Sequence, residues 1–187
     1  VELGVGLIPG GGGTKEMALR ASDSFYDGDI ELPRLKEYFL NIGQAKVSTS
    51  GQEAFELGYL RKGYDSISIN SDKLIQDAKE KVMIIDNQGY TKPIKRKDIK
   101  VLGNQALGMF LVGADSFKEG GYITDHEKLM SKKLAHVLCG GNLSSPTHVS
   151  EQYLLDLERE AFLSLCGEAK TLERIKYMLE KGKPLRN

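Results

Sequence analysis

A glycine-rich turn near the start of the sequence is the first feature that could take part in chemistry. The glycine run at residues 10–13 follows Pro9 directly, and Thr14 and Lys15 come next. A glycine turn that opens a helix can present backbone amides to a phosphate or an oxyanion. Pro9 occupies the third glycine position of G-x-G-x-x-G counted from Gly4, and Thr14-Lys15 reverses the Lys-Ser/Thr order of a P-loop. The run therefore predicts either a ligand-binding turn outside these two motifs or a tight connection between two elements.

Three histidines and one basic run could also contribute to acid–base chemistry or to anion binding. His126, His136 and His148 lie in or beside predicted helices, where we expect packing or capping roles rather than catalysis. The basic run at residues 95–97 could contact a polyphosphate, because clustered cations bind phosphate groups. We expect this run to belong to a solvated linker instead.

Composition and charge narrow the classes of function. The 26 Lys and Arg residues balance the 26 Asp and Glu residues, so no net charge attracts nucleic acid or an anionic membrane surface. Cys139 and Cys166 lie outside any C-x-x-C spacing, which predicts two buried, reduced thiols in a cytoplasmic protein and no metal site. The longest apolar stretch, at residues 106–114, is far shorter than the ~20 residues of a membrane-spanning helix. The sequence opens on Val1 without a signal-peptide pattern, as expected of a fragment.

The elements that must position these residues are predicted to be mainly helices. Residues 1–8 are expected to be extended, and Thr14 can cap a helix that follows the glycine turn. Capping boxes are predicted at residues 50–53 and 124–127. Amphipathic spacing and capping signals place the later helices at about residues 33–43, 51–57, 71–87, 104–118, 125–139, 149–165 and 171–181.

Two of these helices carry apolar stripes that we expect to be buried. The stripe of the helix at residues 71–87 consists of Leu74, Ile75, Ala78, Val82 and Ile85. The stripe at residues 149–165 could bind a partner, although a core helix is the commoner use of such a pattern. It consists of Tyr153, Leu154, Leu157, Ala161 and Leu165. A change of composition at residues 89–93 predicts a boundary, with one domain portion at residues 1–92 and a helical C-terminal lobe at residues 93–187.

The whole segment from Val1 to Thr14 resembles the second active-site segment of the crotonase superfamily. That segment has a Pro-Glu pair followed by Gly-x-x-Pro-Gly-x-Gly-Gly-Thr, and here Val1 stands where proline is usual. Residues 53–60 resemble a later Ala-x-x-x-Gly-Leu-Val element of the superfamily. Residues 45–50, 74–90 and 182–187 are similar to multifunctional enzymes in which a 3-hydroxyacyl-CoA dehydrogenase precedes a crotonase domain. The resemblance therefore covers essentially the full chain.

The resemblance implies a fragment of a bacterial fatty-acid β-oxidation enzyme. Its fold would be mainly α, namely the truncated end of a crotonase-like α/β core followed by a helical C-terminal lobe. The parent chain would be an enoyl-CoA hydratase, which hydrates trans-2-enoyl-CoA, coupled to an NAD-dependent 3-hydroxyacyl-CoA dehydrogenase. The resemblance assigns Glu2 as the catalytic proton donor to the α-carbon, with a pKa raised by an apolar, substrate-covered pocket. It assigns substrate binding to Gly10, Gly11 and Gly12, and no cofactor or metal to the fragment.

The remaining catalytic parts are expected outside this sequence. No second segment here resembles the partner glutamate and oxyanion loop of the family, and none resembles the nucleotide-binding loop or catalytic histidine of the dehydrogenase. The isolated fragment is therefore expected to be inactive, with NAD bound only by the parent dehydrogenase domain. Expected partners are an acyl-CoA thioester, the upstream domains of the parent chain and a thiolase. The alternative is a structural or assembly module that docks the dehydrogenase lobe or the thiolase.

Overall fold

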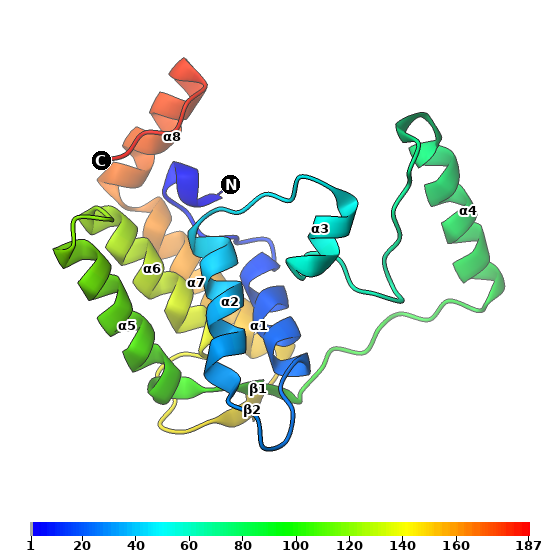
Figure 1. Ribbon diagram of the computed structural model, residues 1–187, viewed down its shortest axis with the longest axis horizontal. Helices are drawn as coiled ribbons and strands as arrows, with labels where there is room; N and C mark the ends of the chain where they lie inside the picture. The colour runs from blue at the N-terminus through cyan, green and yellow to red at the C-terminus, as the bar shows by residue number, and fades with distance from the viewer. Residues whose placement is uncertain (1) are drawn as a thin grey trace. The chain divides into compact units, whose positions relative to one another are not determined.

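The computed structural model describes residues 2–187 and is built mainly from helices, with one two-stranded sheet (Figure 1). The predicted mainly-α fold class is therefore confirmed, whereas the crotonase-like α/β core stays a prediction. The chain divides into two compact units. The larger unit combines the residues before Ser48 with Arg96–Asn187, and the smaller unit is Ser48–Lys95. The predicted boundary between a domain portion at residues 1–92 and a helical lobe at residues 93–187 stays a prediction.

The larger unit contains six α-helices, one 3-10 helix and both strands of the described chain. They are η1 (Glu2–Val5), α1 (Gly13–Asp23), α2 (Glu31–Gly43), β1 (Ile99–Val101), α5 (Gly103–Glu119), α6 (Asp125–Leu138), β2 (Thr147–Val149), α7 (Glu151–Cys166) and α8 (Ala169–Lys181). Strands β1 and β2 pair in antiparallel register, with Ile99 opposite Val149 and Val101 opposite Thr147. Figure 1 shows this short sheet beside the ends of α1 and α2.

Apolar side chains from α1, α5, α6, α7 and β1 form the core of the larger unit. Leu134 of α6 and Ile99 of β1 are fully buried. Leu154 and Leu165 of α7 are buried as well, so the prediction that the α7 stripe belongs to the core is confirmed. Each such side chain contributes roughly 1.5–3 kcal/mol when it leaves water. Packing of these helices against β1 therefore fixes the elements that hold the N-terminal segment.

Side chains at the helix starts account for two of the predicted boundaries. The Thr124 hydroxyl accepts a hydrogen bond from the Glu127 amide (3.2 Å), and the Glu127 carboxylate accepts one from the Thr124 amide (2.8 Å). The predicted capping box at the start of α6 is therefore confirmed. Ser150 caps α7 by accepting a hydrogen bond from the Tyr153 amide (3.1 Å).

The N-terminal segment differs from its prediction in two respects. The residues expected to be extended begin with η1, where the Gly6 amide donates to the Leu3 carbonyl (3.1 Å). Helix α1 is capped by Gly12 rather than by Thr14, because the turn requires a left-handed conformation (φ 95°) that glycine adopts readily. Thr14 lies inside the helix, and its hydroxyl donates to the Pro9 carbonyl (2.9 Å).

The smaller unit contains two α-helices and one turn of 3-10 helix. They are α3 (Gly51–Glu56), η2 (Ser71–Lys73) and α4 (Leu74–Asn87). The Ser50 hydroxyl accepts a hydrogen bond from the Glu53 amide (3.1 Å), and the Asn70 side chain accepts one from the Asp72 amide (3.0 Å). Ser50 therefore caps α3 as predicted, and Asn70 caps η2, the turn that leads into α4.

Helix α4 is exposed along its whole length, so the prediction that it carries a buried stripe is wrong. Ile75 is 84% exposed and Val82 is 64% exposed, and Leu74, Ala78 and Ile85 are exposed too. The reason is the size of the unit. Besides the 14 residues of α4 it has only a six-residue helix and a three-residue turn, which offer too little apolar surface to bury a helix.

Candidate functional site

The N-terminal segment at residues 2–14 carries the residues that the sequence assigns to chemistry. Glu2 is the first residue of η1, and its side chain is exposed. Gly10 and Gly11 are exposed, and Gly12 is half-buried at the start of α1. Because Glu2 is exposed, the apolar pocket expected around it would need walls from outside residues 2–187. The catalytic role of Glu2 and the substrate contacts of the three glycines stay predictions.

A buried carboxylate from α7 closes the glycine turn. Glu158 is 1% exposed, and its two oxygens accept hydrogen bonds from the amides of Gly12 (2.6 Å) and Lys15 (2.8 Å). A negative charge at a helix N-terminus is favourable, because the helix dipole and the unpaired amides both attract it. The Glu158 carboxylate therefore occupies the position at the start of α1 where a helix favours an anion, and the Gly12 amide is hydrogen-bonded to it.

Glu158 is not among the residues predicted from the sequence, although its position in α7 carries one signal. It lies four residues after Leu154 and three before Ala161, so it falls on the buried stripe of the helix. A carboxylate in an apolar stripe must find donors when it is buried, because an unpaired buried charge is very costly. The identity of those donors depends on a contact across 146 residues, which local spacing does not reveal.

An ion pair strengthens the same attachment between α1 and α7. The Lys15 ammonium lies 2.8 Å from the Glu151 carboxylate, which also accepts a hydrogen bond from the Arg96 amide (2.9 Å). Burial lowers the pKa of Lys15, but the hydrogen bonds and charges of Glu151 and Glu16 outweigh burial and raise it. Lys15 is therefore held in its charged form as a structural cation.

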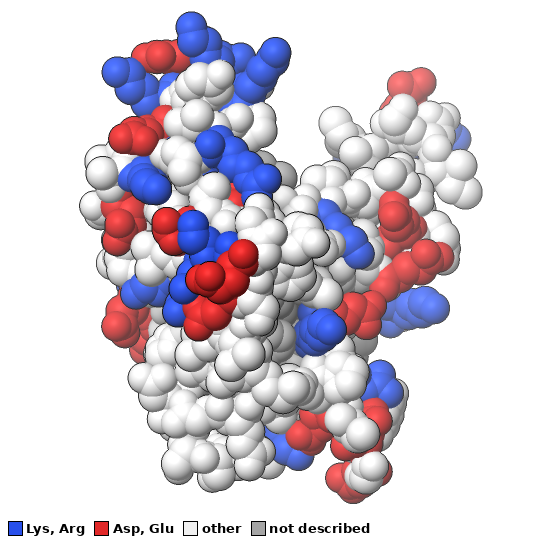
Figure 2. All heavy atoms as spheres, turned by 60° about the vertical axis from the view of Figure 1, so that its left-hand side comes forward, with Lys and Arg blue, Asp and Glu red and all other residues white. Residues whose placement is uncertain are grey.

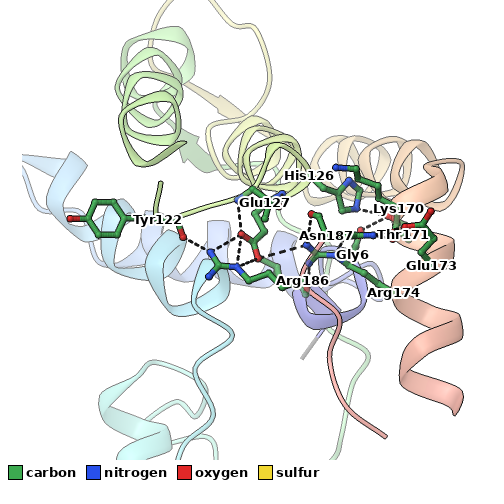
Figure 3. Close-up of polar contacts among 12 residues, drawn as sticks. Gly6, Tyr122, His126, Glu127, Lys170, Thr171, Glu173, Arg174, Arg186 and Asn187 are labelled. Atoms are coloured by element: carbon green, nitrogen blue, oxygen red, sulfur yellow. Dashed lines mark hydrogen bonds and ion pairs between the residues drawn. The ribbon is translucent and has the colours of Figure 1, made fainter. Parts of the chain in front are cut away.

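A buried hydrogen-bonded chain joins η1 to α8 and α6 (Figure 3). The Thr171 hydroxyl donates to the Gly6 carbonyl (2.9 Å), and Nε2 of His126 lies 2.9 Å from the same hydroxyl. A hydroxyl has one hydrogen, so Nε2 of His126 must be the donor in the second bond. Burial, and then the charge of Arg174, lower the pKa of His126. His126 is therefore a neutral donor that positions Thr171, which agrees with the structural role expected from the sequence.

A buried arginine holds the other side of η1. Arg174 is 2% exposed, and its guanidinium lies 3.5 Å from the Leu3 carbonyl oxygen and 3.7 Å from the Glu127 carboxylate. Arg174 also donates to the Asn187 side chain (2.8 Å), and Arg186 pairs with Glu127 at 3.0 Å. Figure 3 shows these side chains converging on Glu127 from α8 and the C-terminal residues. Burial lowers the pKa of Arg174. Burial alone would raise the pKa of Glu127, but Arg186 and the capping hydrogen bond outweigh burial and lower it.

The polar groups around the N-terminal segment are therefore engaged with one another. They can hold Gly6 and Gly12 in their positive-φ conformations and present Glu2 and Gly10 at the surface. Among residues 2–187, no group of three His, Cys, Asp or Glu residues is arranged to hold a metal ion. Figure 2 shows positive and negative side chains interspersed over the visible face, and exposed Lys176 and Glu180 of α8 form one of the surface pairs.

The other candidate residues from the sequence lie away from this segment. Arg96, the middle residue of the basic run at 95–97, pairs with Asp23 at 2.6 Å and Asp98 at 2.9 Å, so a carboxylate pair already satisfies its guanidinium. His136 lines a hollow of about 310 Å³ together with charged residues, and burial lowers its pKa. His148 is exposed in β2.

Both cysteines are free thiols, as predicted. Cys139 is fully buried, and burial raises the pKa of its thiol to about 12. Cys166 is only half-buried, so the expectation of two buried thiols holds for Cys139 alone. A thiol with so high a pKa is not a nucleophile near neutral pH, and Cys139 serves packing.

Comparison with known proteins gives a similarity that extends over the whole chain. The chain is 46% identical over all 187 residues to a Bacillus subtilis (strain 168) protein named "Probable 3-hydroxyacyl-CoA dehydrogenase". No family model and no solved structure matches the sequence. Within residues 2–187, none of the helices has both the length and the apolar character that crossing a membrane requires. The similarity covers the whole of this chain, which spans 23% of the length of the Bacillus protein.

Proposed function

We propose that this chain is one part of a longer 3-hydroxyacyl-CoA dehydrogenase, which oxidises 3-hydroxyacyl-CoA thioesters with NAD. The observation that supports it is 46% identity over the full chain to the Bacillus subtilis protein of that name. Since the chain spans 23% of that protein, the activity would belong to the longer polypeptide. NAD and the catalytic histidine would then lie on parts outside these 187 residues.

The glycine turn of this chain does not fit NAD. The pyrophosphate of a dinucleotide binds at a helix N-terminus through unpaired backbone amides. In this chain the Glu158 carboxylate accepts from the Gly12 and Lys15 amides at the start of α1. Its negative charge would also repel a phosphate. These residues therefore take no part in the proposed NAD-dependent oxidation.

The test is NADH formation from 3-hydroxybutyryl-CoA by the longer protein that contains this chain and by the chain alone. We expect NADH only with the longer protein, because the glycine turn at the start of α1 does not fit NAD. A longer protein that forms no NADH would overturn the proposal. NADH formation by the isolated chain would show instead that the nucleotide binds here.

We propose hydration of trans-2-enoyl-CoA as a second activity of the longer protein. The partner glutamate outside these residues would accept a proton from water as the hydroxyl adds to the β-carbon, and Glu2 would donate a proton to the α-carbon. Transfer of one proton from the partner glutamate back to Glu2 would restore both groups. Exposed Gly10 and Gly11, with Gly12 beside them, would contact the thioester. The support is that Glu2 and the glycine turn belong to the segment that resembles the crotonase motif, and that Glu2 is exposed to an incoming ligand.

A matched pair of substitutions tests this second activity in the longer protein. Glu2→Gln should lower the rate of enoyl-CoA hydration by about 10²–10⁴, the usual contribution of a general acid. Glu119→Gln, which changes an exposed carboxylate at the end of α5, should leave the rate unchanged. Both variants should retain NADH formation. Equal hydration rates for the two variants would remove Glu2 from the mechanism.

A structural or assembly role is the alternative, and exposed helix α4 favours it. The apolar side chains of α4, including Ile75 and Val82, meet water in the isolated chain. Such a surface commonly marks a protein contact, with the rest of the longer protein or with a thiolase as the partner. Calorimetric titration separates the two roles. Binding of acyl-CoA to the isolated chain supports a substrate role, whereas binding only to the rest of the protein or to a thiolase supports assembly.

A further inference from the structure

An apolar groove runs between α2 and α5 in the larger unit, away from the N-terminal segment. It has a volume of about 410 Å³ and is closed at one end by the residues that precede α6. Leu32, Phe39 and Leu40 line it from α2, and Met109, Phe110 and Phe117 line it from α5. The rings of Phe39 and Phe110 stack with their centroids 4.6 Å apart and join the two walls.

The groove exposes large apolar side chains to water. Met109 is 61% exposed, Phe117 is 52% exposed and Tyr122 is 69% exposed. A hollow of about 300 Å³ elsewhere in the larger unit is lined mostly by charged residues, and one of about 310 Å³ mixes Lys132, Lys133 and Glu160 with apolar side chains. An apolar concavity of a few hundred Å³ with few polar groups is the usual form of a small-molecule site.

We propose that this groove binds the acyl tail of an acyl-CoA thioester, an inference that rests on the proposed function. Four lining residues carry polar side-chain groups, namely Lys36, Gln44, Tyr122 and Ser131. A peptide strand would leave its backbone amides and carbonyls largely unpaired there, at a cost of several kcal/mol. A hydrocarbon tail has no such groups, and it would cover the exposed rings of the groove.

The edge of the groove suits the polar end of such a ligand. Lys36 is exposed in the first half of α2 and belongs to the lining. A lysine ammonium binds phosphate as a point charge, so it can meet the phosphorylated head of CoA while the tail lies against Phe39 and Phe117. Each methylene group buried in the groove should tighten binding about fourfold. Affinity should therefore rise with acyl chain length.

Two glycines of α5 offer a substitution and its matched control. Gly113 lines the groove, whereas Gly108 lies outside it, and a Cβ on either residue would meet no heavy atom within 4 Å. Gly113→Leu therefore places a side chain in the groove at a position with room for its Cβ, and Gly108→Leu adds the same side chain elsewhere on the helix. Both changes replace glycine inside a helix and should favour helix formation by about 1 kcal/mol. Loss of binding in the first variant alone would then not result from unfolding.

Titration calorimetry of the 187-residue chain with lauroyl-CoA, CoA and free laurate tests the inference. We expect lauroyl-CoA to bind at least about tenfold more tightly than CoA or laurate. Lauroyl-CoA has both a twelve-carbon tail for the groove and phosphates for Lys36, whereas CoA lacks the tail and laurate lacks the phosphates. Gly113→Leu should weaken lauroyl-CoA binding about tenfold or more, and Gly108→Leu should not change it.

Four results would overturn the inference. They are absence of lauroyl-CoA binding, equal binding of lauroyl-CoA and CoA, laurate binding as tight as that of lauroyl-CoA, and equal binding by the two leucine variants. If Gly113→Leu altered only self-association, the groove would belong to a protein contact instead. Failure here is distinct from failure of the dehydrogenase proposal, because NADH formation from a four-carbon substrate in the longer protein does not require a long acyl tail.

Discussion

The Glu158 carboxylate lies 2.6 Å from the Gly12 amide nitrogen, although 146 residues separate the two in the sequence. The second oxygen of Glu158 accepts from the Lys15 amide at 2.8 Å. One buried side chain of α7 thus satisfies two donors at the start of α1. Hydrogen bonds to an ionised acceptor are stronger than neutral ones, so the glycine turn depends on this carboxylate.

Replacing Glu158 by Gln should lower the free energy of unfolding by about 2–3 kcal/mol. The amide has only one oxygen acceptor, so one of the two backbone donors would be left unpaired. Urea unfolding followed by circular dichroism measures the loss. Glu160→Gln changes an exposed carboxylate two residues along the same helix and should alter stability by less than about 0.5 kcal/mol. Similar losses for both variants would contradict the role of Glu158.

Gly6 should tolerate no side chain. A Cβ there would lie 2.8 Å from the Thr171 hydroxyl oxygen and 2.9 Å from the Thr171 Cα, and the backbone has φ +89°. Gly6→Ala should therefore lower the free energy of unfolding by more than about 2 kcal/mol, from steric overlap and backbone strain together. Gly4→Ala is the control, because a Cβ on Gly4 meets nothing within 4 Å. Equal thermal unfolding temperatures for the two variants would contradict this prediction.

Acidification should destabilise the protein through His126. Burial, and then the charge of Arg174, lower the pKa of His126 below its ordinary value of 6.5. Below pH 6.5 the unfolded chain therefore binds more protons at this residue than the folded chain does. The stability that neutral His126 contributes is complete above that pH and is lost as the pH falls toward the folded-state pKa. Free energies of unfolding measured at about pH 7.5 and about pH 5.5 check this.

His126→Gln tests the assignment, because glutamine keeps an N–H donor but does not titrate in this range. The variant should lose less stability on acidification than the natural sequence does. Part of the loss should persist, since burial lowers the pKa of His136 too. An unchanged pH dependence would show that His126 does not contribute to it.

Helix α4 should tolerate charge in the isolated chain. Val82 is 64% exposed, so Val82→Lys should change the free energy of unfolding by less than about 0.5 kcal/mol. Leu134 is fully buried, so Leu134→Ala should lower the free energy of unfolding by about 2–5 kcal/mol. Urea unfolding compares the two variants. A loss above about 1 kcal/mol for Val82→Lys would mean that α4 is covered in solution.

The helices of this protein could be predicted from local sequence, because caps and amphipathic spacing act within a few residues. Thr124 with Glu127, and Ser50 before α3, marked helix starts that the structure confirms. The stripe of α4 shows the limit of the same method. Spacing indicates which side chains share a face, but it does not indicate whether another element exists to cover Ile75 and Val82.

The attachments of the N-terminal segment could not be predicted in this way. The sequence pointed to Glu2 and to the glycine turn, whereas the groups that hold them, Glu158, Thr171 and Arg174, come from the last quarter of the chain. Among these three residues, only Glu158 carries a local signal, because it falls on the buried stripe of α7. Their roles depend on tertiary contacts, which carry no local signature.

The hydrogen bond from Thr171 to the Gly6 carbonyl spans 165 residues and has a consequence for biosynthesis. During translation the N-terminal segment leaves the ribosome long before α7 and α8 do. The hydrogen bonds of Gly6 with Thr171 and of Gly12 with Glu158 can therefore form only after those helices have been synthesised. Contacts between such distant residues form slowly, because a long loop must close first. The segment that resembles an active site is therefore arranged only after α7 and α8 have been synthesised, and a polypeptide that stops before α7 lacks these contacts.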